Sequence, residues 1–314
     1  MKNLLASLLF LFSYFNCHSQ EDNSSVPFVS YWGMGDSYDF QITKIKQKWK
    51  EGVLENNDSN SYRANFLVID STDVSYKIKW TYQTNLDKLN IPANLIEKFS
   101  KYKMTEVIYQ TSEVGDFLGV ENWKEISDLM NKILGELMND LAANDDSKMK
   151  VLKSTFKPLL SAYSSREGIE QLILAELQLF HFPFGIEFST KEPLIYEDQL
   201  PNMFGGKPIR GDAKIYIDSV DFDNAYCVLV QEMSLNPEDT KKMILNFFKK
   251  AKLNHREMKR AMKNALIDIR DYNTFAYLYY PGIPLKIESK RETILNIDKT
   301  KGKRVDITRI ELIN

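Results

Sequence analysis

Residues able to act as acids, bases or nucleophiles are few in this chain and lie far apart. Beyond His18, the only histidines are His181 and His255, in unrelated contexts. Zinc sites need several His or Cys ligands at short spacing, so we predict no metal and no cofactor. The Gly-x-Ser-x-Gly elbow, the Walker loop and the dinucleotide fingerprint are also missing. A hydrolase would need a dispersed site, for which the candidates are His181, Glu187, Glu197 and Asp198.

A glycine-rich stretch, Tyr196 to Asp212, contains Lys207 and Arg210. Free backbone and positive charge together suit an anion, and we take these two side chains as candidate anion contacts. The stretch leads into a strand rather than into a helix whose amides would complete a phosphate site. The alternative is therefore a long connection with glycines at positive φ.

A second basic region lies between Pro237 and Leu266, with nine bases and three acids. Its charges recur at helical intervals, which predicts a basic stripe that contacts anionic lipid headgroups or an acidic partner. The alternative is an ordinary solvated helix face. The candidate contacts are Lys252, Arg256, Lys259 and Lys263. The formal net charge of −2 gives no reason to expect nucleic acid as a partner.

Aromatic residues gather in segments that read as strands. The candidates for an apolar ligand site are Trp80, Tyr82, Tyr277 and Tyr279, and the alternative is that they form the core. Cys227 lies in an alternating apolar strand, which predicts a buried, unreactive thiol.

The elements that position these residues follow from periodicity. Strand alternation dominates from Tyr38 to Gln83 and again from Phe184 onwards, whereas helical spacing marks Trp123 to Leu141 and Lys148 to Leu179. A further helix begins at Asn236, which suits an N-cap before Pro237. The blocks that contain Ile-Asp-Ser at 69–71 and 217–219 share an order of three strands, a helix and two strands. We predict an α+β fold: curved antiparallel sheet, built from a duplicated unit or from unrelated strands, with long helices packed on one face.

The N-terminus reads as an export signal. Lys2 precedes the apolar run Leu4 to Phe15, which is too short to span a bilayer. We predict cleavage after Ser19 and a soluble periplasmic or extracellular protein; the alternative is a lipoprotein anchored at Cys17. No later run reaches membrane length, so no transmembrane segment is predicted in the mature chain. The predicted organisation is a signal peptide (1–19), a linker (20–34), an N-terminal β-rich half with a helical pair (35–180) and a C-terminal β-rich half (181–314).

The Ser-Gln leader and the stretches "YKIKWTY", "GDFLGVENWKEI" and "NMFGGKPI" resemble uncharacterised exported proteins of Bacteroidota. The resemblance implies a compartment and no activity. "DST" at 70–72 and "DSV" at 218–220 are similar to the sequence that Bacteroidota O-glycosylate on exported proteins, which makes Ser71 and Ser219 candidate glycosylation sites. Hairpin turns favour the same residues.

Three functions are left open. The first, which we favour, is a non-catalytic envelope protein that binds an apolar or amphiphilic ligand, such as a lipid, or another envelope protein. The second is the dispersed hydrolase. The third is a structural or assembly role in the envelope.

Overall fold

The computed structural model describes residues 24–83, 106–173, 175–200, 207–250, 260, 262–297 and 300–313. Within them, eleven strands form one antiparallel sheet in the order β6-β5-β4-β3-β2-β13-β12-β11-β10-β9-β8, and β1 pairs with β7 in a second, small sheet. The strands are β1 Ser25–Pro27, β2 Ser37–Lys50, β3 Val53–Thr72, β4 Ser75–Gln83, β5 Glu106–Ser112, β6 Phe117–Val120, β7 Glu187–Ser189, β8 Leu194–Leu200, β9 Ile209–Asp221, β10 Tyr226–Leu235, β11 Leu266–Leu278, β12 Ile283–Ile297 and β13 Thr300–Leu312. The helices are α2 Trp123–Ala142, α3 Asp146–Tyr163, α4 Arg166–Ile173, α5 Ala175–His181 and α6 Pro237–Lys250.

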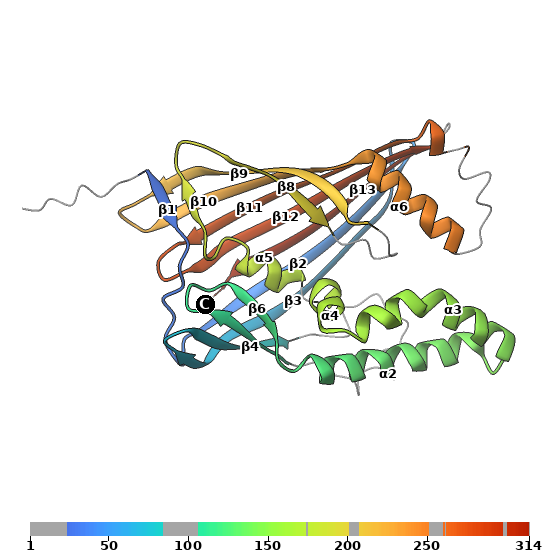
Figure 1. Ribbon diagram of the computed structural model, residues 1–314, viewed down its shortest axis with the longest axis horizontal. Helices are drawn as coiled ribbons and strands as arrows, with labels where there is room; N and C mark the ends of the chain where they lie inside the picture. The colour runs from blue at the N-terminus through green and yellow to red at the C-terminus, as the bar shows by residue number, and fades with distance from the viewer. Residues whose placement is uncertain are drawn as a thin grey trace, which may run out of the picture.

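The central strands are unusually long. β3 has 20 residues, which corresponds to roughly 65 Å of extended chain. It pairs with β2 from Ser37↔Leu67 to Lys50↔Val53, across a tight turn at Glu51 and Gly52. Both turn residues have positive φ, 51° and 80°, as the two-residue turns that match the twist of a hairpin require. The long strands reach well beyond α5, the short helix that packs against the sheet (Figure 1).

β13 lies in the middle of the sheet, between β2 and β12 (Figure 1). On its two sides the strands run in the same order, β6 to β2 and β12 to β8. The shared Ile-Asp-Ser sequence lies at an irregularity in both blocks, since the pairing of β3 with β4 skips Ile69 and that of β9 with β10 skips Asp218, the next position of the shared sequence. This is the arrangement that a duplicated unit would give. The first copy's predicted helix lies outside the described residues, and the duplication stays a prediction.

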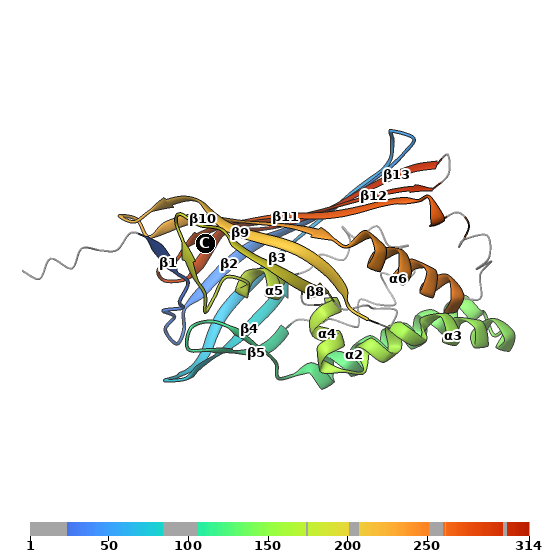
Figure 2. The same ribbon diagram turned by 45° about the horizontal axis from the view of Figure 1, so that its top comes forward.

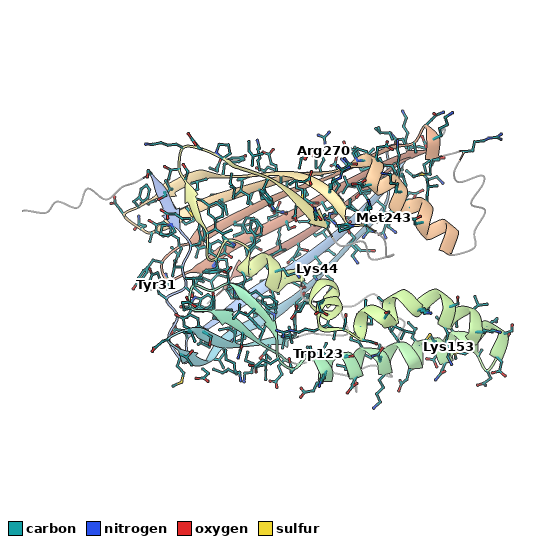
Figure 3. All side chains as sticks on the ribbon, in the orientation of Figure 1. Tyr31, Lys44, Trp123, Lys153, Met243 and Arg270 are labelled. Atoms are coloured by element: carbon teal, nitrogen blue, oxygen red, sulfur yellow. The ribbon has the colours of Figure 1, made fainter. Side chains whose placement is uncertain are left out.

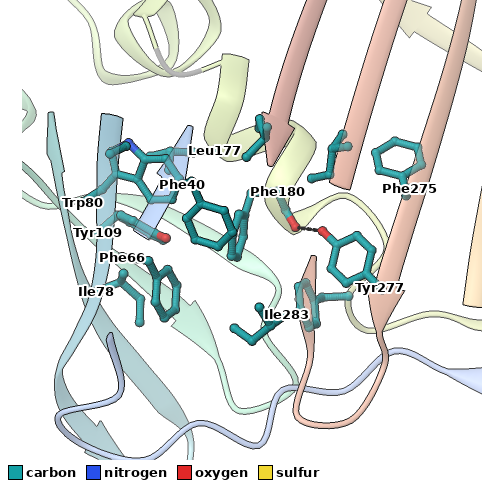
Figure 4. Close-up of a cluster of buried hydrophobic side chains, with 14 of the residues drawn as sticks. Phe40, Phe66, Ile78, Trp80, Tyr109, Leu177, Phe180, Phe275, Tyr277 and Ile283 are labelled. Atoms are coloured by element: carbon teal, nitrogen blue, oxygen red, sulfur yellow. Dashed lines mark hydrogen bonds between the residues drawn. The ribbon is translucent and has the colours of Figure 1, made fainter. Parts of the chain in front are cut away.

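The core lies where α5 packs into the curved sheet (Figure 4). Phe180 of α5 contacts the rings of Phe40, Phe66 and Trp80 at centroid distances of 5.3–5.7 Å. The hydroxyl of Tyr277 donates a hydrogen bond to the backbone oxygen of Phe180. The residues of this main core that lie on the sheet and α5 include Phe40, Ile42, Phe66, Ile78, Trp80, Tyr109, Leu177, Phe180, Phe275 and Tyr277. Such aromatic contacts fix α5 at one end of the long strands.

The prediction of an α+β fold with long helices on one face of the sheet is wrong. Strands make up 55% and helices 25% of the structure. α2 and α3 pack mainly against each other and extend past the sheet (Figure 2), and Ser127 of α2 donates a hydrogen bond to the Tyr163 carbonyl at the end of α3. Ile126 joins the main core, whereas Leu134 and Met138 are buried outside it. Helical periodicity predicts an apolar stripe correctly, but it does not say which element covers that stripe.

The predicted break between the two helical segments is confirmed, since α2 ends at Ala142 and α3 begins at Asp146. The second segment is itself interrupted, because α3 ends at Tyr163 and α4 begins at Arg166. α6 begins at Pro237, and Asn236 caps it by accepting hydrogen bonds from the amides of Glu238 and Asp239. Residues 24–34, part of the predicted linker, pack onto the sheet, with Val26, Phe28 and Trp32 buried. Both predicted halves contribute strands to the same sheet.

Candidate ligand-binding face of the sheet

One face of the sheet packs against α5, and we call it the inner face. On β2 it carries Phe40 and Ile42, both fully buried. Because side chains alternate along a strand, the same face continues with Lys44, Lys46, Lys48 and Lys50. The inner face of one strand thus changes from apolar to basic within a few residues.

Lys46, Lys48 and Lys50 form what we call the lysine row. All three are exposed, and within the described part of the chain none forms an ion pair. The neighbouring strand β13 places Arg304 and Asp306 beside the row, paired to each other at 2.6 Å. The row therefore presents three ammonium groups without an ion-pair partner in the described chain, of which Lys46 lies opposite Asp306 on β13 and Asp58 on β3.

Glu176 of α5 lies where the apolar part of the inner face ends. Its side chain is 2% exposed, forms an ion pair with Lys44 and accepts a hydrogen bond from the Tyr62 hydroxyl. Lys44, labelled in Figure 3, lies beside α5. Burial, and then the charge of Glu176, raise the pKa of Tyr62, so its hydroxyl stays protonated and donates. Glu176 Oε2 is buried without a hydrogen-bond partner among the described residues.

A polar network crosses the inner face on the other side of β13. Arg291 of β12 donates two hydrogen bonds of 2.6 Å to Asp271 of β11. Asn273 donates to Gln231 at 2.6 Å, and Gln231 donates to the Tyr196 hydroxyl at 2.7 Å. Asn273 Oδ1 is a second buried acceptor without a partner in the described chain. Paired and unpaired polar groups thus line the inner face beyond the core.

α6 covers an apolar part of the same face. Met243 of α6, labelled in Figure 3, packs with Met233 and Ile269, and Ile244 and Leu245 pack with Ile267 and Leu295. Leu295 lies directly opposite Gly302 of β13, which in turn lies opposite Lys50. The lysine row and the α6 cluster are therefore two strands apart on one face.

His181 does not form a hydrolase site with the carboxylates proposed for it. Its Nδ1 lies 2.8 Å from the Gly115 carbonyl oxygen and its Nε2 lies 2.9 Å from the Tyr109 hydroxyl. Burial lowers the pKa of His181 to about 4, so the imidazole is neutral at ordinary pH. Glu187 accepts a hydrogen bond from Ser25 in the small sheet, and Glu197 and Asp198 lie on the edge strand β8. No group of three potential metal ligands occurs in the described ranges.

The four predicted aromatic ligand contacts lie in or beside the main core. Trp80 and Tyr277 are fully buried, and Tyr82 and Tyr279 are half-buried and pack against it. The structure brings Trp80 and Tyr82 together with ring centroids 6.4 Å apart, and Tyr277 lies on the other side of Phe180. Neighbouring side chains of the core already occupy the surroundings of Trp80 and Tyr277.

The predicted basic contacts are spread over the molecule. Arg210 forms an ion pair of 2.7 Å with Asp239 and so ties β9 to the first turn of α6. Lys207 and Lys263 are exposed, whereas Lys252, Arg256 and Lys259 lie outside the described residues. The stretch around Lys207 and Arg210 is a hairpin of β8 and β9, of which residues 201–206 lie outside the described ranges.

Ser71 and Ser219 are both exposed, beside the strand irregularities described above. Cys227 is buried, as expected, and burial raises the pKa of its thiol to about 12. The lysine row was not among the predicted sites, although "TKIKQKWK" at 43–50 already shows the alternation. The signal was missed because alternation alone does not say whether the lysines face solvent or an interior.

Comparisons with known proteins assign neither a family nor a function to this chain. Neither a family model nor a curated protein matches this chain. Among solved structures, the chain is similar to Ail, the attachment invasion locus protein of Yersinia pestis, with 4% identity and a TM-score of 0.15 over 90% of this chain and 100% of that one. A TM-score this low supports no conclusion about fold or role. None of the described helices is long and apolar enough to cross a membrane.

Proposed function

We propose that this protein is an exported, non-catalytic envelope protein that binds an anionic amphiphile on the inner face of its sheet. The proposal rests on one observation: three lysines without ion-pair partners in the described chain share a face with the apolar cluster under α6. An anionic head group would lie at Lys46, Lys48 and Lys50, and the apolar part would lie toward Leu295 and the edge of α6.

Export is supported by the sequence of the first nineteen residues, with its basic start and apolar run. Intact mass spectrometry of the protein from its own host tests this part of the proposal. A mass that begins at Gln20 supports soluble export. A mass that begins at an acylated Cys17 would replace soluble export with a lipid anchor, and additional hexose-sized increments would support sugars at Ser71 or Ser219.

Binding is tested by calorimetric titration of the purified chain from Gln20 with laurate, its neutral methyl ester and dodecylammonium. We expect laurate to bind, the ester to bind more weakly and the cation not to bind. Replacement of Lys46 and Lys48 by glutamine should weaken laurate binding roughly tenfold, because each exposed lysine adds only a modest electrostatic attraction to the binding free energy. The matched control is Lys150→Gln/Lys153→Gln on α3, where both side chains are also exposed.

Two results would overturn the proposal: no binding of laurate, or equal loss in the α3 control. Equal affinity for laurate and its methyl ester would show that the charge of the ligand is not recognised, which also contradicts the role assigned to the lysine row.

A further inference from the structure

The outer face of the sheet, turned away from α5 and α6, reverses the polarity of the inner face. Near the core the outer face carries charged side chains that form ion pairs between neighbouring strands. Examples are Glu288 with Arg309 at 2.6 Å and Lys286 with Glu311 at 3.2 Å. At the opposite end of the same strands the apolar side chains lie on the outer face, and these are Ile45, Trp49, Ile294, Val305 and Ile307. Val305 is only 4% exposed although it lies on this outer face.

The β2–β3 turn is hydrogen-bonded to the beginning of β13 at this end. The β2–β3 turn donates the Glu51 amide to the Lys301 carbonyl at 2.9 Å, and the Lys301 amide donates to Glu51 Oε1 at 2.7 Å. Figure 2 shows the β2–β3 turn rising above β12 and β13 at this end of the sheet. Val53 and Leu54, which follow the turn, are 66% and 46% exposed. The turn is therefore held to β13 by two hydrogen bonds and exposes two aliphatic side chains.

A shallow pocket of about 390 Å³ lies on the outer face beside this turn. Its lining includes Trp49, Ile294, Asn296, Lys301 and Lys303. Lys303 lies over the Trp49 ring, 5.5 Å from its centroid, and pairs with Glu292 at 2.8 Å. Lys290 and Lys301 have no ion-pair partner among the residues that the structure describes. We call this end of the sheet, with its turn and its pocket, the tip.

We propose that the tip docks on a lipid surface that carries anionic headgroups. Exposed aliphatic side chains at a projecting turn can enter the boundary between headgroups and acyl chains, a tryptophan suits that boundary, and flanking lysines attract the anionic headgroups. On β12 and β13 the apolar side chains of the outer face lie among Lys290, Lys301 and Lys303, whereas Glu51 and Glu55 flank Val53 and Leu54 in the turn. Apolar side chains beside these lysines fit such a surface better than they fit open water. The inference uses the β2–β3 turn and the outer face, and of its side chains only Val53 lies opposite a member of the lysine row, Lys50. Separate variants therefore distinguish it from the ligand proposed for the inner face.

Vesicle sedimentation tests the tip with the chain from Gln20 and vesicles of phosphatidylcholine alone or mixed with phosphatidylglycerol. We expect binding to the anionic vesicles, little binding to the neutral ones, and release at 0.5 M salt, since salt screens exposed charges. The variant Lys290→Gln/Lys301→Gln should bind anionic vesicles roughly thirtyfold more weakly, because each of the two lysines strengthens binding to an anionic surface about fivefold. Lys150→Gln/Lys153→Gln on α3 is the control with the same change in charge.

The apolar part of the tip has its own pair of variants. Val53→Ser/Leu54→Ser should reduce vesicle binding, whereas Val74→Ser should not, because Val74 is 69% exposed in the turn at the other end of β3. Circular dichroism spectra equal to the wild type establish that the variants fold. The lysine-row variant Lys46→Gln/Lys48→Gln should bind laurate more weakly but bind anionic vesicles as the wild type does. This result distinguishes a failure of the tip proposal from a failure of the proposed inner-face ligand site.

Three results would overturn the inference: equal binding to neutral vesicles, tip variants that bind like the wild type, or a concentration-dependent dimer abolished by Val53→Ser/Leu54→Ser. The last result would assign the tip to a second copy of the chain.

Discussion

The Nε2 atom of His181 on α5 lies 2.9 Å from the hydroxyl oxygen of Tyr109 on β5, inside the main core. The Gly115 carbonyl, 2.8 Å from Nδ1, can only accept, so Nδ1 carries the proton and Nε2 accepts from the tyrosine. Both residues are fully buried or nearly so. With the imidazole neutral, the tyrosine hydroxyl therefore donates to Nε2, and the pair joins α5 to the first block of strands.

This arrangement predicts a loss of stability in weak acid. The folded-state pKa of His181 is about 4, below the usual 6.5, so between these values the unfolded chain binds more protons and stability falls as pH falls. We expect His181→Gln to be less stable than the wild type at pH 7, and this difference to shrink by about 3 kcal/mol at pH 4. Urea unfolding of both proteins at pH 7, 5.5 and 4 measures it. A difference that does not change with pH would show that His181 does not titrate on unfolding.

Tyr62 and Glu176 should be energetically coupled. Removal of the hydroxyl in Tyr62→Phe leaves a buried carboxylate with one partner fewer, and we expect a loss of about 1–2 kcal/mol. Glu176→Gln keeps the shape but loses the charge that pairs with Lys44, which is 39% exposed and so contributes little. A double-mutant cycle measured by chemical denaturation should give a coupling of about 1 kcal/mol. Additive losses would mean that the hydroxyl and the carboxylate do not stabilise each other.

Two glycines at positive φ offer a comparison between strain and steric overlap. Gly35 (φ 92°) has no atom within 4 Å of the position that a Cβ would occupy, whereas at Gly115 (φ 97°) a Cβ would lie 2.7 Å from the Phe184 ring. Gly35→Ala should cost about 1 kcal/mol from backbone strain alone. Gly115→Ala should cost about 1–3 kcal/mol more, because Phe184 is buried and must move. Thermal unfolding of the two variants measures the difference, and equal costs would contradict the packing around Phe184.

The thiol of Cys227 should be inert in the folded protein. Burial raises its pKa to about 12, and the side chain has no exposed surface. With Cys17 replaced by serine, we expect no reaction with a thiol reagent at pH 8 in buffer and one equivalent in 6 M guanidinium. Rapid labelling of the native protein would show that β10 opens locally.

Much of the secondary structure could be predicted because its causes are local. The alternation of Ile78 and Trp80 with Lys77 and Lys79 predicts a half-buried strand, and β4 has that burial. Asn236 predicts the start of α6 because its side chain satisfies amides two and three residues later.

The fold class could not be predicted in the same way, since the partner of an amphipathic element is not encoded locally. The stripe of α2 is covered by α3 rather than by the sheet, and the short α5 takes the place that the long helices were expected to fill. The same limit applies to the candidate site. Glu176 follows Tyr62 by 114 residues and Lys44 by even more, so the three side chains meet only in the folded chain.

The position of β13 has a consequence for the order of folding. The last of the described strands in chain order lies at the centre of the sheet, where it pairs with β2 on one side and β12 on the other. Until residues 300–312 have been synthesised, both neighbours keep an unpaired edge, and the two blocks of strands cannot join. The sheet thus stays incomplete until β13 emerges, which suits the proposed export, since a chain must be threaded through a translocation pore before it folds. Unpaired strand edges of this kind favour association between incompletely folded chains.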